Sequence, residues 1–181
     1  PWPKPPQFPG LWRGAPLPSP PAPAIADGMV RLTFGALWER AVDAAAAYVA
    51  AGLETGERVA IWAPNCADWI IACVGAQAAG GVLVPLNTRF KGPETRYILE
   101  RASVAMIVLT EGFLGNNFGE MLADWHPPFL RRRIVFGQDS PDGWTGFLAG
   151  ADGPARVEAQ ARIARIGADS VSDIMFTSGT T

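Results

Sequence analysis

The residues best suited to chemistry stand at the end of the chain, where an apolar run meets a cluster of hydroxyl and glycine residues. The stretch reads "SDIMFTSGTT", and the cluster comprises Thr177, Ser178, Gly179, Thr180 and Thr181. Glycine lets the backbone approach a ligand closely, successive N–H groups can form an anion-binding nest, and the hydroxyls add donors. Donors of this kind stabilise charge developing on a phosphate. The cluster is a candidate phosphate site, although the same residue types also cap helices and fill turns.

Other catalytic devices find little support in the residue types present. The only histidine, His126, is followed by two prolines, so a Ser-His-Asp or Cys-His arrangement has one conceivable centre and no visible partner. Cys66 and Cys73 are seven residues apart, as on one face of a helix, and we interpret them as small buried hydrophobes. These residues do not make a closed zinc site, and no G-x-G-x-x-G motif indicates dinucleotide binding.

The elements that must position the cluster follow a regular alternation from Val30 onward. Thr33 is expected to cap one helix that Gly52 ends, and Asn65 to cap another that runs to about Ala79. Helices are predicted at "GALWERAVDAAAAYVAA", at the segment after Asn65 and at "GPETRYILERA", and strands at "VRLTF", "RVAIWA", "VLVPL", "AMIVLT", "RIVFG" and a buried "DIMFT". This alternation predicts an α/β fold with a mostly parallel sheet and helices on both faces.

The chain divides into two parts by composition. Residues 1–24 hold ten of the 17 prolines and are interpreted as a Pro-rich arm or leader, either packed on the domain, processed or artificially added, or as a ligand for a partner domain. This segment has no apolar stretch typical of a signal peptide. Residues 25–181 form one α/β subdomain, within which 138–170 are interpreted as a connection with a weak helix at "ARVEAQARIARI".

Composition excludes several classes of protein. A chain of 181 residues with 49% apolar residues can bury one sizeable core, and a net charge of -2 provides no basic field for nucleic acid. The run Arg131–Arg133 is interpreted as a solvated entry to a strand. The stretch from Trp69 to Thr88 carries no charge, but Gly80, Gly81 and Pro85 interrupt it, so we expect a helix and a strand rather than a membrane span. A cytoplasmic location is the default expectation.

A family resemblance emerges from several ordered blocks. "DIMFTSGTT" resembles the first half of the phosphate-loop motif [YF]-T-S-G-[ST]-T-G-x-P-K-G of the AMP-forming acyl-adenylating superfamily. "RLTFGALWERA", "GERVAIWAPNCADWIIACVGAQAAGGVLVPLNTRF" and "GPETRYILERASVAMIVL" are similar to the family's preceding blocks, so the resemblance covers roughly residues 24–181. Among subgroups, the chain looks most like bacterial fatty-acyl or steroid-catabolic CoA ligases.

The resemblance implies the N-terminal part of an ATP-dependent acyl-CoA ligase, reaching Thr181 within its phosphate loop. Such an enzyme joins a carboxylic acid to ATP, releases pyrophosphate, and passes the acyl group from acyl-AMP to coenzyme A. Thr177 to Thr181 would hold the ATP phosphates, and Thr177 would help to place magnesium. Asn65, Asn87 and Arg89 lie in recognisable blocks but are assigned structural roles, a helix cap and a turn at a strand end. A homodimer is a possible assembly.

The G-x-P-K-G continuation and the later family segments lie outside the 181 residues, so we expect this chain alone to be inactive. Two alternatives remain open. A flavodoxin-like electron carrier also holds a phosphate, that of FMN, with an S/T-G-T loop after a parallel strand. A non-catalytic interaction module that presents its proline arm is the other.

Overall fold

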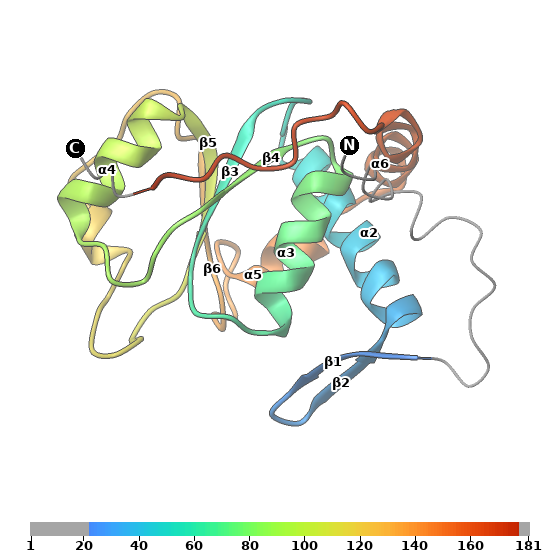
Figure 1. Cartoon of the computed structure of the whole chain (residues 1–181), viewed down its shortest axis with the longest axis horizontal. Coiled ribbons are helices and arrows are strands. Elements are labelled where there is room, and N and C mark those ends of the chain that lie inside the picture. Colours follow the sequence, from blue (N-terminus) through green and yellow to red (C-terminus); the bar gives the residue numbers. More distant parts are fainter. Residues whose placement is uncertain (1–21, 178–181) are drawn as a thin grey trace, which may run out of the picture.

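The computed structural model describes residues 22–177 and contains a four-stranded parallel sheet in the order β4-β3-β5-β6 (Figure 1). The strands are β3 (Arg58–Trp62), β4 (Val82–Pro85), β5 (Val104–Leu109) and β6 (Arg132–Val135). Alternate residues of a strand point to opposite faces of its sheet. In β3, Val59 and Ile61 accordingly enter one apolar cluster, whereas Ala60 and Trp62 enter another.

Each face of the sheet is covered by its own set of helices. The helix-rich face packs against α2 (Phe34–Ala50), α3 (Ala67–Ala78), α5 (Trp144–Ala149) and α6 (Gly153–Arg165). The opposite face packs against α4 (Gly92–Arg101) and the short 3-10 helix η1 (Glu120–Leu122). The prediction of an α/β fold with helices on both faces of a parallel sheet is confirmed.

An antiparallel hairpin precedes the sheet and projects from the body of the molecule (Figure 1). It comprises β1 (Pro23–Asp27), which the sequence did not reveal, and β2 (Val30–Thr33). Thr33 then caps α2 as predicted, because its hydroxyl accepts a hydrogen bond from the Ala36 N–H. The Asp27 carboxylate accepts a hydrogen bond of 2.9 Å from the Ala67 N–H and so ties the hairpin to the start of α3.

The uncharged stretch from Trp69 to Thr88 forms most of α3, a turn and β4, as predicted. Within residues 22–177, no helix is long and apolar enough to cross a membrane. The predicted cap at Asn65 is wrong by one residue: the N-cap is Cys66, whose Sγ accepts a hydrogen bond from the Trp69 N–H. Thiols rank low among capping groups, so the sequence favoured the neighbouring asparagine.

The segment interpreted as a connection contains more structure than predicted. Both α5 and α6 lie within it, and α6 is a 13-residue helix capped by Asp152 and packed against α2. Its half-buried Arg162 donates to the backbone carbonyls of Leu53 and Ala79. Tertiary contacts therefore stabilise a helix whose isolated sequence is only weakly amphipathic.

The predicted buried strand at "DIMFT" is wrong in both respects. Asp173 forms a single parallel bridge with Leu83, and Ile174 and Met175 are 36% and 71% exposed. Leu83 exchanges hydrogen bonds with Ser172 and Ile174, but Pro85 has no N–H to continue the ladder. The segment Val171–Thr177, here called the edge segment, therefore lies at the open edge of the sheet beside β4 and is not an interior strand.

Candidate phosphate site

The candidate phosphate residues begin where the edge segment passes the carboxyl end of β4. Thr177 is exposed, and Ser178, Gly179, Thr180 and Thr181 lie outside the described residues. Because the bridge between Asp173 and Leu83 is parallel, the segment runs in the same direction as β4. At Thr177 the chain therefore reaches the end of the sheet formed by the carboxyl ends of the strands, here called the carboxyl edge. Ligands of α/β proteins bind at this edge.

The preceding residue, Phe176, anchors this segment to the core. Phe176 packs against the apolar cluster that contains Trp62 and Phe118. These two fully buried rings stack with centroids 4.2 Å apart and planes inclined by 11°. Stacking adds to the favourable free energy of burying these rings. The pair therefore forms a stable apolar layer beneath the carboxyl edge.

The turn after β4 contacts the same aromatic pair through Trp62. The Trp62 indole Nε1–H donates to the Asn87 carbonyl at 3.2 Å, and the Asn87 side chain accepts from the Arg89 N–H at 2.9 Å. The structural role predicted for Asn87, a turn at a strand end, is confirmed. Within residues 22–177 the Arg89 side chain makes no hydrogen bond or ion pair, so this exposed cation at the carboxyl edge has no described structural partner.

Glu111, two residues beyond β5, is a polar group that sequence reasoning missed. Its Oε1 accepts a hydrogen bond of 2.9 Å from the Gly119 N–H, whereas its buried Oε2 has no partner among the described residues. A Cβ on Gly119 would lie 2.2 Å from Oε1, so a larger residue there would displace the Glu111 carboxylate from this hydrogen bond. Burial, aided by the nearby charge of Glu120, raises the pKa of Glu111. A single acidic residue after a strand offers no sequence signal for this arrangement.

The remaining candidates of the sequence do not gather into a catalytic or metal site. His126 is exposed in the loop before β6, and Cys73 lies within α3, where burial raises its pKa to about 11. Across residues 22–177, no three His, Cys, Asp or Glu side chains are placed to hold a metal ion. Magnesium takes oxygen ligands, commonly carboxylates and substrate phosphates. The described residues offer it one hydroxyl at the phosphate site, that of Thr177, and do not form a magnesium site by themselves.

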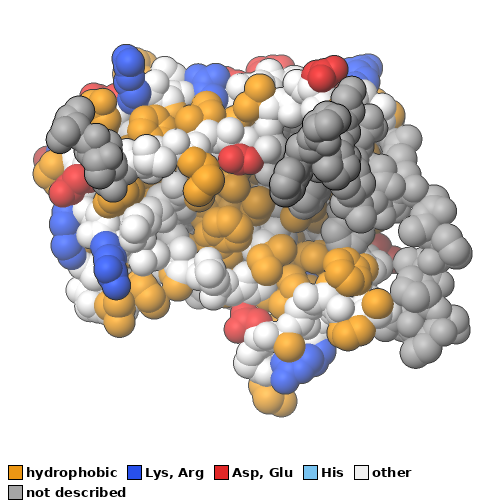
Figure 2. Space-filling view, in the orientation of Figure 1, with side chains coloured by type: hydrophobic (Ala, Val, Ile, Leu, Met, Phe, Trp, Pro, Cys, Tyr) orange, Lys and Arg blue, Asp and Glu red, His pale blue; other side chains and the backbone are white. Residues whose placement is uncertain are grey.

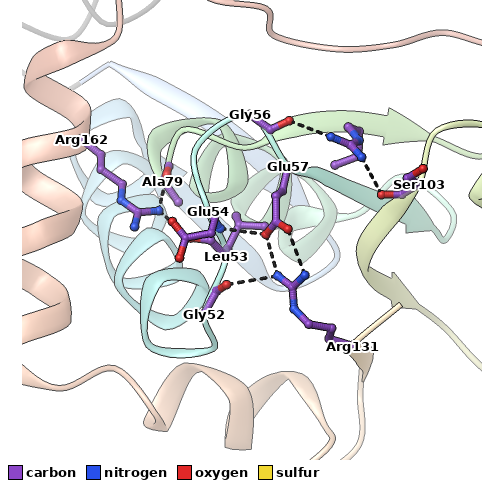
Figure 3. Close-up of polar contacts among 10 residues, drawn as sticks. Gly52, Leu53, Glu54, Gly56, Glu57, Ala79, Ser103, Arg131 and Arg162 are labelled. Atoms are coloured by element: carbon purple, nitrogen blue, oxygen red, sulfur yellow. Dashed lines mark hydrogen bonds and ion pairs between the residues drawn. The ribbon is translucent and has the colours of Figure 1, made fainter. Parts of the chain in front are cut away.

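Arg131 and Arg162 lie at the opposite edge of the sheet, where the strands begin (Figure 3), and Arg58 at the start of β3 lies at the same edge. Arg131 makes two hydrogen bonds to the Glu57 carboxylate and one to the Gly52 carbonyl, while Arg58 donates to the Ser103 carbonyl. The run Arg131–Arg133 enters β6, and Arg131 is exposed, as interpreted from the sequence. The three side chains also donate hydrogen bonds to Glu57, to the Pro141 carbonyl and to the Trp125 carbonyl, which the sequence did not indicate. These contacts are structural and lie away from Thr177.

An open groove of about 1120 Å³ lies elsewhere among the described residues. Its walls include residues at the starts of β3 and β4, the end of α6 and the segment 166–174. The groove thus follows the amino ends of the strands, whereas the candidate phosphate site lies beyond their carboxyl ends. The groove is therefore separate from the candidate phosphate site.

Comparison with known proteins identifies the family. The family of AMP-binding enzymes matches residues 15–181. The chain belongs to this family. Its relatives include a 3-[(3aS,4S,7aS)-7a-methyl-1,5-dioxo-octahydro-1H-inden-4-yl]propanoyl:CoA ligase of Rhodococcus jostii, 42% identical over 87% of this chain and 32% of that protein. The ligase of the same name from Mycobacterium tuberculosis is 40% identical over 83% of this chain and 30% of its own length.

Solved structures agree with this assignment. The N-terminal domain of FACL13 from M. tuberculosis superposes with a TM-score of 0.69 at 26% identity, covering 88% of this chain and 38% of that one. MbtA from Mycobacterium smegmatis, at 24% identity and a TM-score of 0.70, shares the fold over 89% of this chain and 29% of its own. The chain therefore spans about a third of the length of these relatives. The flavodoxin-like alternative is not supported by these matches.

Proposed function

We propose that the chain is the N-terminal part of an ATP-dependent acyl-CoA ligase, here called the parent enzyme. The parent enzyme joins a carboxylic acid to ATP to form acyl-AMP and pyrophosphate, and then forms acyl-CoA and AMP. The observation that carries this proposal is the family match over residues 15–181, which includes the segment reaching the carboxyl edge of the sheet at Thr177.

The role proposed for Thr177 to Thr181 is to hold the phosphates of ATP. Backbone N–H groups around Gly179 and the adjacent hydroxyls would donate to phosphate oxygens, and such contacts become stronger as negative charge moves onto the leaving pyrophosphate. Magnesium, when bound, neutralises part of that charge. Thr177 is the described residue that we propose to contribute an oxygen near it.

The proposed substrate is a carboxylic acid with a bulky fused-ring group, of the class handled in steroid degradation. This proposal rests on the names of the two relatives at 40% and 42% identity. A fatty acid is the alternative substrate of the same reaction. A cytoplasmic location, a homodimer and a separate Pro-rich arm at residues 1–24 are proposed on the sequence alone.

The experiment is ATP–pyrophosphate exchange, which reports formation of the acyl adenylate without coenzyme A. The parent enzyme is expected to exchange label when given an octahydroindene-type propanoate, and residues 1–181 are expected to give no exchange above background. Fatty acids of increasing length serve as competing substrates. Carboxylate-dependent exchange by the 181-residue chain, or none by the parent enzyme with any of these acids, would contradict the proposal.

A further inference from the structure

The outward face of α3 has a composition unusual for a helix surface. Its half-buried residues Ile70, Cys73, Val74 and Gln77 are spaced i, i+3, i+4 and i+7 and form one uncharged stripe, here called the α3 stripe. The other face of α3 packs against α2, where Gly75 meets Ala44. A helix that is apolar on all sides is normally covered on all sides.

The edge segment extends this partly exposed surface. The Gln77 side chain donates to the Ser172 carbonyl at 3.2 Å, which places the segment directly beside the α3 stripe. Val171 and Ile174, which are 63% and 36% exposed, line the open groove together with Val74. Figure 2 shows hydrophobic side chains gathered in the middle of the face on which α3 and this segment lie.

The connections within the sheet indicate which face a further helix would cover. The connection from β3 to β4 runs across the sheet toward its β4 edge, and the helix of that connection, α3, lies on the helix-rich face. The step from β4 to β5 travels the other way, and α4 lies on the opposite face. From β6 back to the edge segment the chain again travels toward the β4 edge, and α5 and α6 lie on the helix-rich face. The three connections therefore share one hand, and the right-handed crossover is the one that parallel sheets adopt almost without exception.

We propose that the α3 stripe is the docking site of the helix that follows the phosphate loop in the parent enzyme. If the chain of the parent enzyme adds a further parallel strand on the far side of the edge segment, the connection to that strand again runs away from β6. The same handedness then places the helix of that connection on the helix-rich face, beside α3. This inference rests on the parent enzyme continuing past Thr181, as proposed above, and its relatives are about three times as long as this chain. The occupant is therefore a segment of the same polypeptide, with apolar residues at i, i+3 and i+4 facing α3.

The chemistry of the stripe fits such an occupant. The stripe itself contains no charged side chain, and the described charge next to it is that of Asp173, which acts on Cys73. A partner helix is therefore expected to bring apolar or small residues to the stripe. The helix would leave the carboxyl edge and return toward the amino edge, as α3 does. It would thus cover Val74 and Gln77 before reaching the groove that these residues line.

The test is the reactivity of a single cysteine in the parent enzyme. Gln77→Cys is made in a background of Cys66→Ser and Cys73→Ala in which any other cysteine of the parent enzyme is also replaced, and its alkylation by a maleimide is compared with that of the same protein unfolded in urea. Val157→Cys, at a residue of α6 that is 69% exposed, is the matched control. We expect alkylation at position 77 to be slowed at least ~100-fold in the native protein, as for a site reached only through local opening, and the control to react readily.

Three results would overturn the proposal. Position 77 could react as fast as in urea, or both positions could be protected equally. Protection could also disappear on dilution, in which case a second copy of the chain covers the stripe. Because labelling requires no turnover, an active ligase with a reactive cysteine at position 77 would refute this docking site and leave the proposed function standing.

Discussion

Gly75 on α3 lies so close to Ala44 on α2 that a Cβ at position 75 would come within 2.5 Å of the Ala44 Cβ. The Ala41 carbonyl oxygen would be 3.1 Å from the same atom. Neither neighbour is a flexible side chain that could move aside. The two helices pack against each other along much of their length, so this close approach sets the position of α3 above the sheet.

Gly75→Ala is therefore expected to lower the free energy of unfolding by about 1–3 kcal/mol, because overpacking outweighs the higher helix propensity of alanine. Urea denaturation followed by circular dichroism measures the change. Gly153→Ala is the matched control, since open space surrounds that glycine at the start of α6. Equal denaturation midpoints for the two variants would show that the helices can separate without cost.

The cap of α3 offers a second prediction. Cys66→Ala removes the Sγ that accepts the Trp69 N–H and is expected to cost about 0.5 kcal/mol of stability, the lower end of the range for preferred capping side chains. Cys66→Ser retains an acceptor of a preferred capping type and should be at least as stable as the natural protein. Asn65→Ala alters an exposed residue and should change the melting temperature little. If Asn65→Ala proves the more damaging of the two alanine variants, the capping assignment is wrong.

Glu111 leads to a prediction about pH. Burial raises its pKa in the folded protein, so the folded state binds a proton more readily than the unfolded state. The contribution of Glu111 to stability is therefore most favourable at acidic pH and declines as pH rises through its folded pKa. Glu111→Gln cannot titrate at this position but keeps an acceptor for the Gly119 N–H.

The measurement is urea denaturation of both proteins at pH 4 and at pH 7. The stability of the natural protein relative to Glu111→Gln should decrease from the lower to the higher pH. All other titrating groups are common to both proteins and cancel in this difference. An increase across the same interval would mean that the folded protein favours the ionised carboxylate.

Thr177 is the described residue at which the phosphate proposal can be tested by substitution. In the parent enzyme, Thr177→Val keeps the shape of the side chain but removes the hydroxyl. Loss of one hydrogen bond to a charged group is expected to reduce kcat/KM for ATP roughly tenfold or more. Thr177→Ser keeps the hydroxyl and should retain most of the activity in ATP–pyrophosphate exchange. An unchanged kcat/KM for Thr177→Val would remove this residue from the phosphate site.

Local sequence patterns predicted most elements of the fold because their signals lie within a few residues of one another. Thr33 precedes a helical pattern and caps it, and Gly52 adopts a positive φ of 81° just beyond the end of the same helix. The apolar runs of β3, β4 and β5 are short, buried and separated by helices, which is sufficient to indicate a parallel sheet. The motif beginning at Thr177 likewise indicated the family without any structure.

Tertiary structure decided the features that depend on distant partners. Whether "DIMF" is buried depends on what lies beyond the β4 edge and on the missing N–H of Pro85, and neither can be read from the apolar run itself. The pairing of Arg131 with Glu57 joins residues 74 positions apart, and the contacts of Arg162 join α6 to two turns more than 80 positions away. The sequence determined which segments form helices and strands, because those preferences are local, whereas packing across the sheet decided which of their surfaces are covered.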